Sequence, residues 1–242
     1  MRIILSLTIL SLISFSLYSQ TELSEINDPD GFTNIREGKS SKTPVVAKVE
    51  LGDFFYAEPS KTESWWKVST IAGLVGYMHK SRVRLIKDMD DDYRKEVIMI
   101  ALDMRKRDEE SVAKAEQSGD EELAHKKRAN REQNVWNVYN PALSTFPDYF
   151  CENPDETMVD LFFQTILVTQ NSANEIPSYT LGEMYLCNPD FILKQIGTYE
   201  YDDEQTLVGA LYWGFENVVY DMDPKPENVE DLKRRINGMI KN

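Results

Sequence analysis

Histidine and cysteine are both scarce in this chain of 242 residues, which contains two of each. Structural zinc sites use about four Cys or His ligands, and a disulfide framework needs several cysteine pairs, so both are excluded. Basic residues are also in deficit, because 27 Lys and Arg face 41 Asp and Glu and leave a formal net charge of −14. A nucleic-acid backbone is bound by clustered Lys and Arg. We therefore expect no nucleic-acid partner, no metal and no cofactor.

Long hydrophobic runs are absent except at the N-terminus. Arg2 precedes an apolar run over residues 3–17, and the small residue Ser19 follows it. This order is typical of a secretory signal peptide covering residues 1–19, with cleavage before Gln20. The alternative is a transmembrane anchor, but the run is shorter than the roughly 20 apolar residues that span a membrane. We expect an exported protein, periplasmic or extracellular, with no stable membrane span after signal cleavage.

The charge balance changes near residue 88. Residues 22–87 carry 10 basic and 9 acidic side chains, whereas residues 88–242 carry 16 basic and 32 acidic ones. The residue types change at the same place, from short runs rich in Val, Trp, Phe and Gly to long stretches with helical spacing. The sequence therefore predicts a multidomain β + α protein, with a small β-barrel at 22–87 and an all-α helical domain at 90–242.

The first domain has the pattern of a series of short strands. β-Branched and aromatic runs alternate with clusters of Asp, Gly and Ser that are typical of turns. The expected strands are Phe32–Arg36, Val45–Val49, Phe54–Ala57, Trp65–Ser69, Leu74–Met78 and Val83–Leu85. Strands this few and this short cannot form two packed sheets, so a strongly bent barrel is favoured.

Short motifs in this domain occur in the order and spacing of one protein family. They are Asn34-Ile35-Arg36-Glu37-Gly38, Val45-Val46, Leu51-Gly52-Asp53, Trp66-Lys67-Val68 and Gly76-Tyr77-Met78-His79, preceded by Asp28-Pro29-Asp30-Gly31-Phe32-Thr33. From about residue 26 to residue 87, the chain resembles bacterial SH3-like (SH3b) domains. The resemblance implies a small β-barrel that binds a cell-wall peptide or docks an envelope protein partner, and it does not imply catalysis. Lys39 departs from the family pattern, which often has Pro at this turn.

Three residues of the expected barrel are candidates for a ligand-binding surface. Trp66 has the strand phase of the core, which places Trp65 on the outer face as a flat aromatic platform. Tyr77 is expected in the barrel wall with its hydroxyl at the rim. Arg36 either pairs with an acidic neighbour such as Asp53 or binds a ligand carboxylate in a bidentate manner. We expect any ligand of the barrel to lie over Arg36, Trp65 and Tyr77.

The second domain shows the three- and four-residue spacing of amphipathic helices. Helical segments are expected at Asp91–Arg107, Glu121–Tyr139, Asp155–Thr169, Glu204–Tyr220 and Asn228–Ile240. The segment Tyr149–Asp155 recurs in shortened form as Tyr185–Asp190, each time with a Cys and the triplet Asn-Pro-Asp. This echo indicates either two stacked helical-hairpin repeats or two uses of Asn-Pro-Asp as a helix start.

Cys151 and Cys187 are the candidates for a disulfide. If the two cysteines occupied equivalent positions in adjacent helical repeats, their Cα atoms would be about 8–10 Å apart, which is too far for a disulfide bond. Export into an oxidising compartment favours bonding. The two copies of the recurring segment differ in length by one residue, which weakens the argument that the cysteines occupy equivalent positions. We therefore expect a structural disulfide.

Motifs of common catalytic sites are missing from the sequence. Asp88–Asp92 lacks the Gly and Glu that a helix-loop-helix calcium site needs. We therefore assign no catalytic residue and expect an exported, non-catalytic binding or scaffold protein. Two alternatives stay open. One is a cell-wall enzyme targeted by the barrel, with two convergent carboxylates or a Cys–His pair in a helical-domain pocket. The other is an acidic inhibitor or immunity protein that binds a basic partner.

Overall fold

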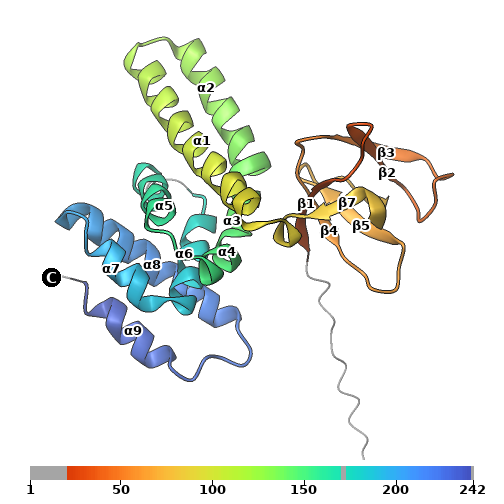
Figure 1. Ribbon diagram of the computed structural model, residues 1–242. Coiled ribbons are helices and arrows are strands. Elements are labelled where there is room, and N and C mark those ends of the chain that lie inside the picture. Colours follow the sequence, from red (N-terminus) through yellow and green to blue (C-terminus); the bar gives the residue numbers. More distant parts are fainter. Residues whose placement is uncertain (1–20, 170–172, 241–242) are drawn as a thin grey trace, which may run out of the picture.

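The computed structural model describes residues 21–169 and 173–240, in which a β region is followed by a helical region (Figure 1). The expected signal peptide, residues 1–19, lies outside the described residues. A short 3-10 turn at Ile86–Asp88 joins the two regions, close to the change in charge balance. The expected order of a β domain and then a helical domain is thus confirmed. Within the described residues, no helix has the length and apolar character needed to cross a membrane.

The β region is one antiparallel sheet that curls into a half-barrel (Figure 1). Its strands are β1 (Glu22–Ile26), β2 (Phe32–Arg36), β3 (Val45–Glu50), β4 (Phe55–Glu58), β5 (Trp65–Thr70), β6 (Val75–His79) and β7 (Val83–Leu85). Neighbouring strands follow the order β3-β2-β6-β5-β4-β1-β7. Every strand except β1 matches an expected one to within one residue at either end. β1 pairs with both β4 and β7, so it completes the sheet between them.

β1 is buried on both faces, and one of its side chains holds the half-barrel to the helical region. Ile26 belongs to the interior cluster of the half-barrel, whereas Glu25 lies on the other face and is only 3% exposed. The Glu25 carboxylate pairs with Arg84 of β7 and accepts a hydrogen bond of 2.6 Å from the Tyr93 hydroxyl. Burial and the hydrogen bond to Glu25 raise the pKa of Tyr93 to about 12. Tyr93 therefore stays a protonated donor across the physiological range.

Apolar contacts extend this junction. Phe54, immediately before β4, packs against a small buried cluster formed by Val97, Ala101 and Ala142 of the helical region. The Lys87 ammonium lies 2.5 Å from a carboxylate oxygen of Glu22 at the start of β1. Polar and apolar contacts together fix the β1–β4–β7 side of the sheet against the helices.

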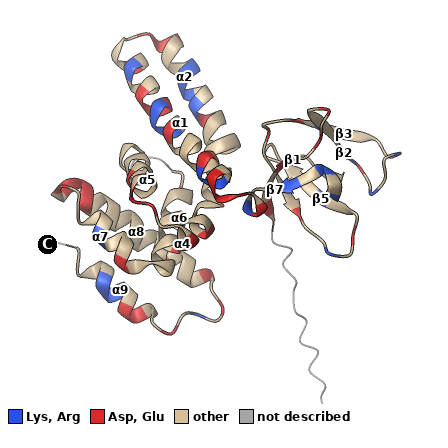
Figure 2. Ribbon diagram, in the orientation of Figure 1, with Lys and Arg blue, Asp and Glu red and all other residues tan. Residues whose placement is uncertain are grey.

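A long helical hairpin begins the helical region (Figure 1). It consists of α1 (Asp91–Gln117) and α2 (Glu121–Asn134), and α1 extends well past the expected end at Arg107. Figure 2 shows Lys, Arg, Asp and Glu distributed along both helices. Arg131 of α2 pairs with Glu109 of α1 at 3.2 Å, so charged contacts cross the hairpin.

The rest of the helical region surrounds the main hydrophobic core. α2 continues into a π-helical segment (Val135–Tyr139), followed by α3 (Asn140–Leu143), α4 (Phe146–Glu152), α5 (Glu156–Val168), α6 (Ile176–Cys187), α7 (Pro189–Ile196), α8 (Tyr201–Asp221) and α9 (Val229–Asn237). Phe162, Tyr185 and Phe215 are among its fully buried side chains. The sequence pattern misses the short helices α3 and α4 and also α6, which carries apolar residues around much of its circumference and shows no clear amphipathic stripe. α7 is amphipathic, with Ile192 and Ile196 buried four residues apart, and it lies where the second Asn-Pro-Asp was interpreted as a helix start.

α6 and α8 touch through their backbones. A Cβ atom at Gly214 of α8 would lie 1.7 Å from the backbone oxygen of Ser178, and one at Gly182 of α6 would lie 2.6 Å from the backbone carbon of Gly214. No side-chain rotation can relieve a clash with backbone atoms. The close approach of α6 and α8 therefore requires glycine at both positions.

We expect Gly214→Ala to lower the free energy of unfolding by at least about 2 kcal/mol, because overpacking of a tight core contact costs on the order of 1–3 kcal/mol or more. Gly209→Ala is the matched control on the same helix, since a Cβ there meets nothing within 4 Å. It should instead raise stability by about 0.5–1 kcal/mol through helix propensity. Urea unfolding followed by circular dichroism measures both changes, and equal effects would contradict the close approach of α6 and α8.

Candidate functional site

The outer faces of β2, β6 and β5 bring the three candidate residues together. Arg36 pairs with Tyr77 across β2 and β6, and Trp65 pairs with His79 across β5 and β6. Tyr77 and His79 lie two residues apart on one strand, so their side chains share a face, while the intervening Met78 is buried in the interior. Residues that are far apart in the sequence thus form one surface.

A glycine allows β2 to approach β6 at this surface. A Cβ atom at Gly76 would lie 2.5 Å from the backbone oxygen of Arg36 and 2.6 Å from the Ile35 side chain. Any larger residue would push the two strands apart. Gly76 therefore contributes to the site by setting the distance between the strands that carry Arg36 and Tyr77.

Trp65 and Tyr77 line a shallow hollow of about 250 Å³ on this outer face. The Trp65 ring meets the His79 ring edge-on, with 5.5 Å between ring centroids. Lys39 and Lys67 also line the hollow, and the Lys39 ammonium lies 5.7 Å from the centroid of the Tyr77 ring. The aromatic surface expected from the sequence is therefore bordered by two lysines that the sequence did not single out.

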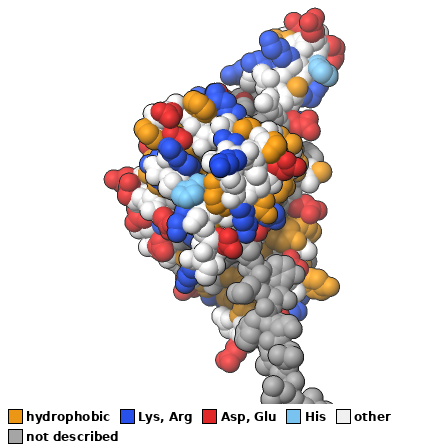
Figure 3. Space-filling model, turned by 90° about the vertical axis from the view of Figure 1, so that its right-hand side faces the viewer, with side chains coloured by type: hydrophobic (Ala, Val, Ile, Leu, Met, Phe, Trp, Pro, Cys, Tyr) orange, Lys and Arg blue, Asp and Glu red, His pale blue; other side chains and the backbone are white. Residues whose placement is uncertain are grey.

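Each of these lysines already has a carboxylate partner. Lys39 lies 3.2 Å from Glu63, and Lys67 lies 2.5 Å from Glu58, whose hydrogen bond and charge raise the pKa of Lys67. Exposed ion pairs of this kind contribute only about 0–1 kcal/mol, so a ligand can replace one partner at little cost. Figure 3, which looks onto the half-barrel, shows basic and hydrophobic side chains interspersed over it.

Arg36 takes a different position from the expected one. Its Nη1 donates a hydrogen bond of 2.8 Å to the backbone oxygen of Thr43, which ties the loop between β2 and β3. Pairing with Asp53 is wrong, because the Asp53 carboxylate accepts a hydrogen bond from the Glu50 backbone NH instead. Arg36 has no ion-pair partner among the residues that the structure describes. It lies beside Tyr77 in the sheet but does not line the hollow.

Trp65 and Trp66 have the expected strand phases but similar burial. Trp66 packs against the interior cluster, and its Nε1 donates a hydrogen bond of 3.1 Å to the backbone oxygen of Ser60. Both indoles are half-buried. Full burial of Trp66 is not reached because this residue, close to the start of β5, also lines the hollow.

Cys151 of α4 and Cys187 of α6 are joined in a disulfide, with Cα atoms 5.7 Å apart. This separation is shorter than the spacing of two packed helix axes, because both cysteines lie at the ends of their helices. The following asparagines adopt nearly the same backbone conformation, with φ −134° and ψ 71° at Asn153 and φ −140° and ψ 76° at Asn188.

The sequence echo around these cysteines marks two helix starts. Asp155 caps α5 by accepting a hydrogen bond from the Met158 backbone NH, and Asn188 caps α7 by accepting one from the Phe191 backbone NH. The capping residue is thus the Asp of the first Asn-Pro-Asp and the Asn of the second. The structure supports the helix-start interpretation of the echo.

Two carboxylates meet in a second hollow, of about 480 Å³, beside the disulfide. They are Asp148 of α4 and Glu183 of α6. Although Glu183 is exposed at the surface, the atoms packed around its carboxyl and the charge of Asp148 raise its pKa. The enzyme alternative requires two convergent carboxylates in a pocket of the helical domain, and these two line one hollow. No group of three or more His, Cys, Asp or Glu side chains suited to a metal ion occurs in residues 21–169 and 173–240.

Comparison with known proteins assigns no family to the chain. It matches no protein-family model, and a search of curated proteins found no match. The geometry of the sites therefore carries the functional argument.

We expect both cysteines to resist thiol labelling in the denatured, unreduced protein, and both to react after reduction. The bond spans 36 residues of sequence. By the chain-entropy estimate, reduction should lower the free energy of unfolding by roughly 3–4 kcal/mol. Mass spectrometry counts the labels, and two labelled cysteines before reduction would contradict the disulfide.

Proposed function

We propose that this chain is an exported, non-catalytic binding protein whose SH3-like half-barrel holds a cell-wall peptide or an envelope protein partner. The observation that carries the proposal is the convergence of Trp65 and Tyr77 in one hollow bordered by Lys39 and Lys67. The ordered motifs of residues 26–87 and the antiparallel sheet support the SH3-like assignment.

The chemistry of the hollow suits an extended peptide. Flat aromatic rings offer large contact area at little cost in side-chain entropy, so Trp65 and Tyr77 form the platform. The lysines on either side supply donors to backbone carbonyls or to a carboxylate. Arg36, next to Tyr77, is placed to extend this surface along β2, and its remaining guanidinium nitrogens are suited to an anionic group.

The helical region serves in this proposal as a scaffold with a fixed orientation to the half-barrel. The junction through Glu25 and Tyr93 lies at β1, whereas the hollow lies on β5 and β6. A ligand can therefore occupy the hollow without contacting the junction. The helices then present a second surface to a further partner.

We expect purified cell-wall peptides to shift backbone amide resonances of residues around Trp65 and Tyr77 in the mature chain, residues 20–242. Trp65→Ala should weaken binding at least about tenfold, or about 1.4 kcal/mol, because stacking on the indole is lost. Trp213→Ala is the matched control, since this partly exposed Trp lies on α8. Shifts confined to other faces of the half-barrel, or equal loss in both variants, would rule out this site.

A second candidate function, a cell-wall enzyme, rests on the carboxylate pair of Asp148 and Glu183. The pKa of Glu183 is raised by the atoms packed around its carboxyl and by the charge of Asp148, and a carboxyl with a raised pKa beside a second carboxyl is an arrangement used in general acid–base catalysis. Incubation of the mature protein with purified cell wall, followed by mass spectrometry of released fragments, tests this function. We expect no release beyond that of an Asp148→Asn, Glu183→Gln double variant, and release by the unmodified chain alone would favour the enzyme.

A further inference from the structure

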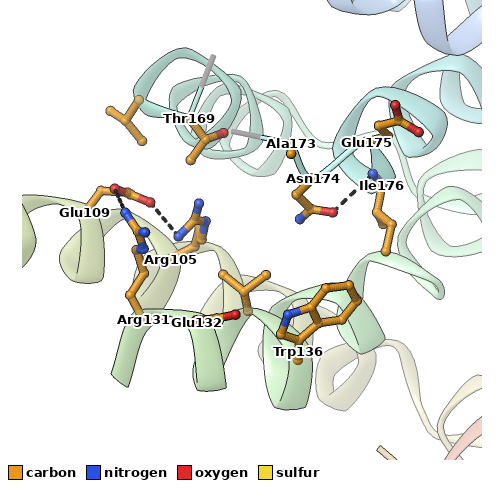
Figure 4. A pocket seen from close by; sticks show the side chains of 12 residues that line it. Arg105, Glu109, Arg131, Glu132, Trp136, Thr169, Ala173, Asn174, Glu175 and Ile176 are labelled. Carbon is orange, nitrogen blue, oxygen red and sulfur yellow. Dashed lines mark hydrogen bonds and ion pairs between the residues drawn. The ribbon is translucent and has the colours of Figure 1, made fainter. Parts of the chain in front are cut away.

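A cavity of about 690 Å³ lies in the helical region, away from the half-barrel hollow (Figure 4). One wall comes from α1, α2 and the π-helical segment, and the facing wall comes from the end of α5 and the start of α6. Val135, Val168 and Ile176 make part of the lining apolar. The volume is within the range of about 300–1,000 Å³ that is usual for small-molecule sites.

Arg105 of α1 lies in the wall of this cavity and is only 3% exposed. Its guanidinium is 2.6 Å from one oxygen of Glu109, and Arg131 is 3.2 Å from the other oxygen, so a single carboxylate is shared by two arginines. The Tyr139 ring lies 5.7 Å from the guanidinium carbon. In Figure 4, Arg105 and Arg131 approach Glu109 from one side of the cavity.

The Nε atom of Arg105 is buried and has no hydrogen-bond partner within the described ranges of the chain. Leaving such a donor unpaired costs on the order of 1–3 kcal/mol, and more for a charged group. Because Glu109 divides its charge between two cations, Arg105 keeps the capacity to bind another anion. The Nε side of a guanidinium, together with one terminal nitrogen, matches the two oxygens of a carboxylate.

Trp136 supplies the aromatic side of the cavity. It belongs to the π-helical segment and is 55% exposed, whereas the preceding Val135 is buried. π-Helical turns are rare and occur frequently at functional sites. Figure 4 shows the indole facing the side chains of Asn174 and Ile176 across the cavity, while the Glu175 carboxylate points away. An uncovered indole beside a buried cation suits a ligand that carries both an apolar part and an anionic part.

We propose that this cavity binds a small carboxylate that carries an apolar or aromatic group. The carboxylate pairs with the guanidinium of Arg105, and the apolar group lies against Trp136 and Ile176. This site is separate from the peptide surface on the half-barrel, so either proposal can fail without the other.

The test uses calorimetric titration of the mature chain with 3-phenylpropionate and with its uncharged amide, 3-phenylpropionamide. We expect the acid to bind at least about tenfold more tightly than the amide, or about 1.4 kcal/mol, because only the acid pairs with Arg105. Inorganic phosphate is a third probe, and it should bind more weakly than the acid because it has no apolar group. Equal binding of the acid and the amide, or absence of binding by the acid, would overturn the proposal.

Two variants test the assigned residues separately. Arg105→Lys keeps the charge but removes the planar fork, so it should reduce the preference for the acid over the amide to that of a single point charge. Trp136→Ala alters an exposed side chain that the fold does not need, and it should weaken binding of both probes about tenfold, or about 1.4 kcal/mol. Trp213→Ala should leave binding unchanged.

Circular dichroism establishes whether each variant is folded. If Arg105→Lys does not fold, Trp136→Ala and the comparison of acid with amide decide the question. Unchanged binding in folded Trp136→Ala protein would overturn the site, as would an unchanged preference for the acid in folded Arg105→Lys protein.

Discussion

Burial of the Glu25 carboxylate is the constraint that joins the two halves of this protein. Removing a carboxylate from water costs several kcal/mol unless charge and hydrogen bonds replace the lost hydration. Arg84 and Tyr93 supply that replacement, one from β7 and one from the first turn of α1. The lost hydration of the Glu25 carboxylate is therefore replaced only when β1, β7 and α1 are all in place. This requirement links the pairing of β1 with β7 to the attachment of α1 at that side of the sheet.

The same junction is distinct from both proposed ligand sites. β1 and β7 hold Glu25 and Arg84, which contact Tyr93 of α1 or each other, whereas the proposed peptide-binding surface lies on β2, β6 and β5. Within the helical region, backbone contact between Gly182 and Gly214 brings α6 and α8 together in the main core. The cavity next to Arg105 lies between the start of α6 and the α1–α2 hairpin, where close packing gives way to longer polar side chains. The tightly packed parts of the protein thus position the half-barrel hollow and the cavity beside Arg105, and they fill neither of them.

Local signals made most of the strands predictable, whereas β1 and the borders of the hollow depend on contacts with distant residues. The strands from β2 to β7 were predictable because alternation and turn residues are read within a few positions. β1 has the sequence Glu-Leu-Ser-Glu-Ile, which does not look like a buried strand until Tyr93 and Arg84 are known to satisfy Glu25. The outward phase of Trp65 was predictable from Val68. The positions of Lys39 and Lys67 around Tyr77 were not, because the register between strands and the conformation of a loop decide them.

Arg94 and Arg105 show how a structural arginine differs from one that can hold a ligand. Both are buried on α1, both pair with carboxylates, and both lie near a tyrosine ring. Arg94 has Glu152 and Asp91 as two separate partners, both at its Nη1, so two carboxylates compensate its charge. Among residues 21–169 and 173–240, Arg105 pairs only with Glu109, which it shares with Arg131, and it borders a cavity. Burial and a buried Nε without a hydrogen-bond partner in the described ranges are common to both residues. The shared carboxylate and the adjoining cavity are what make Arg105 the stronger anchor for an added anion.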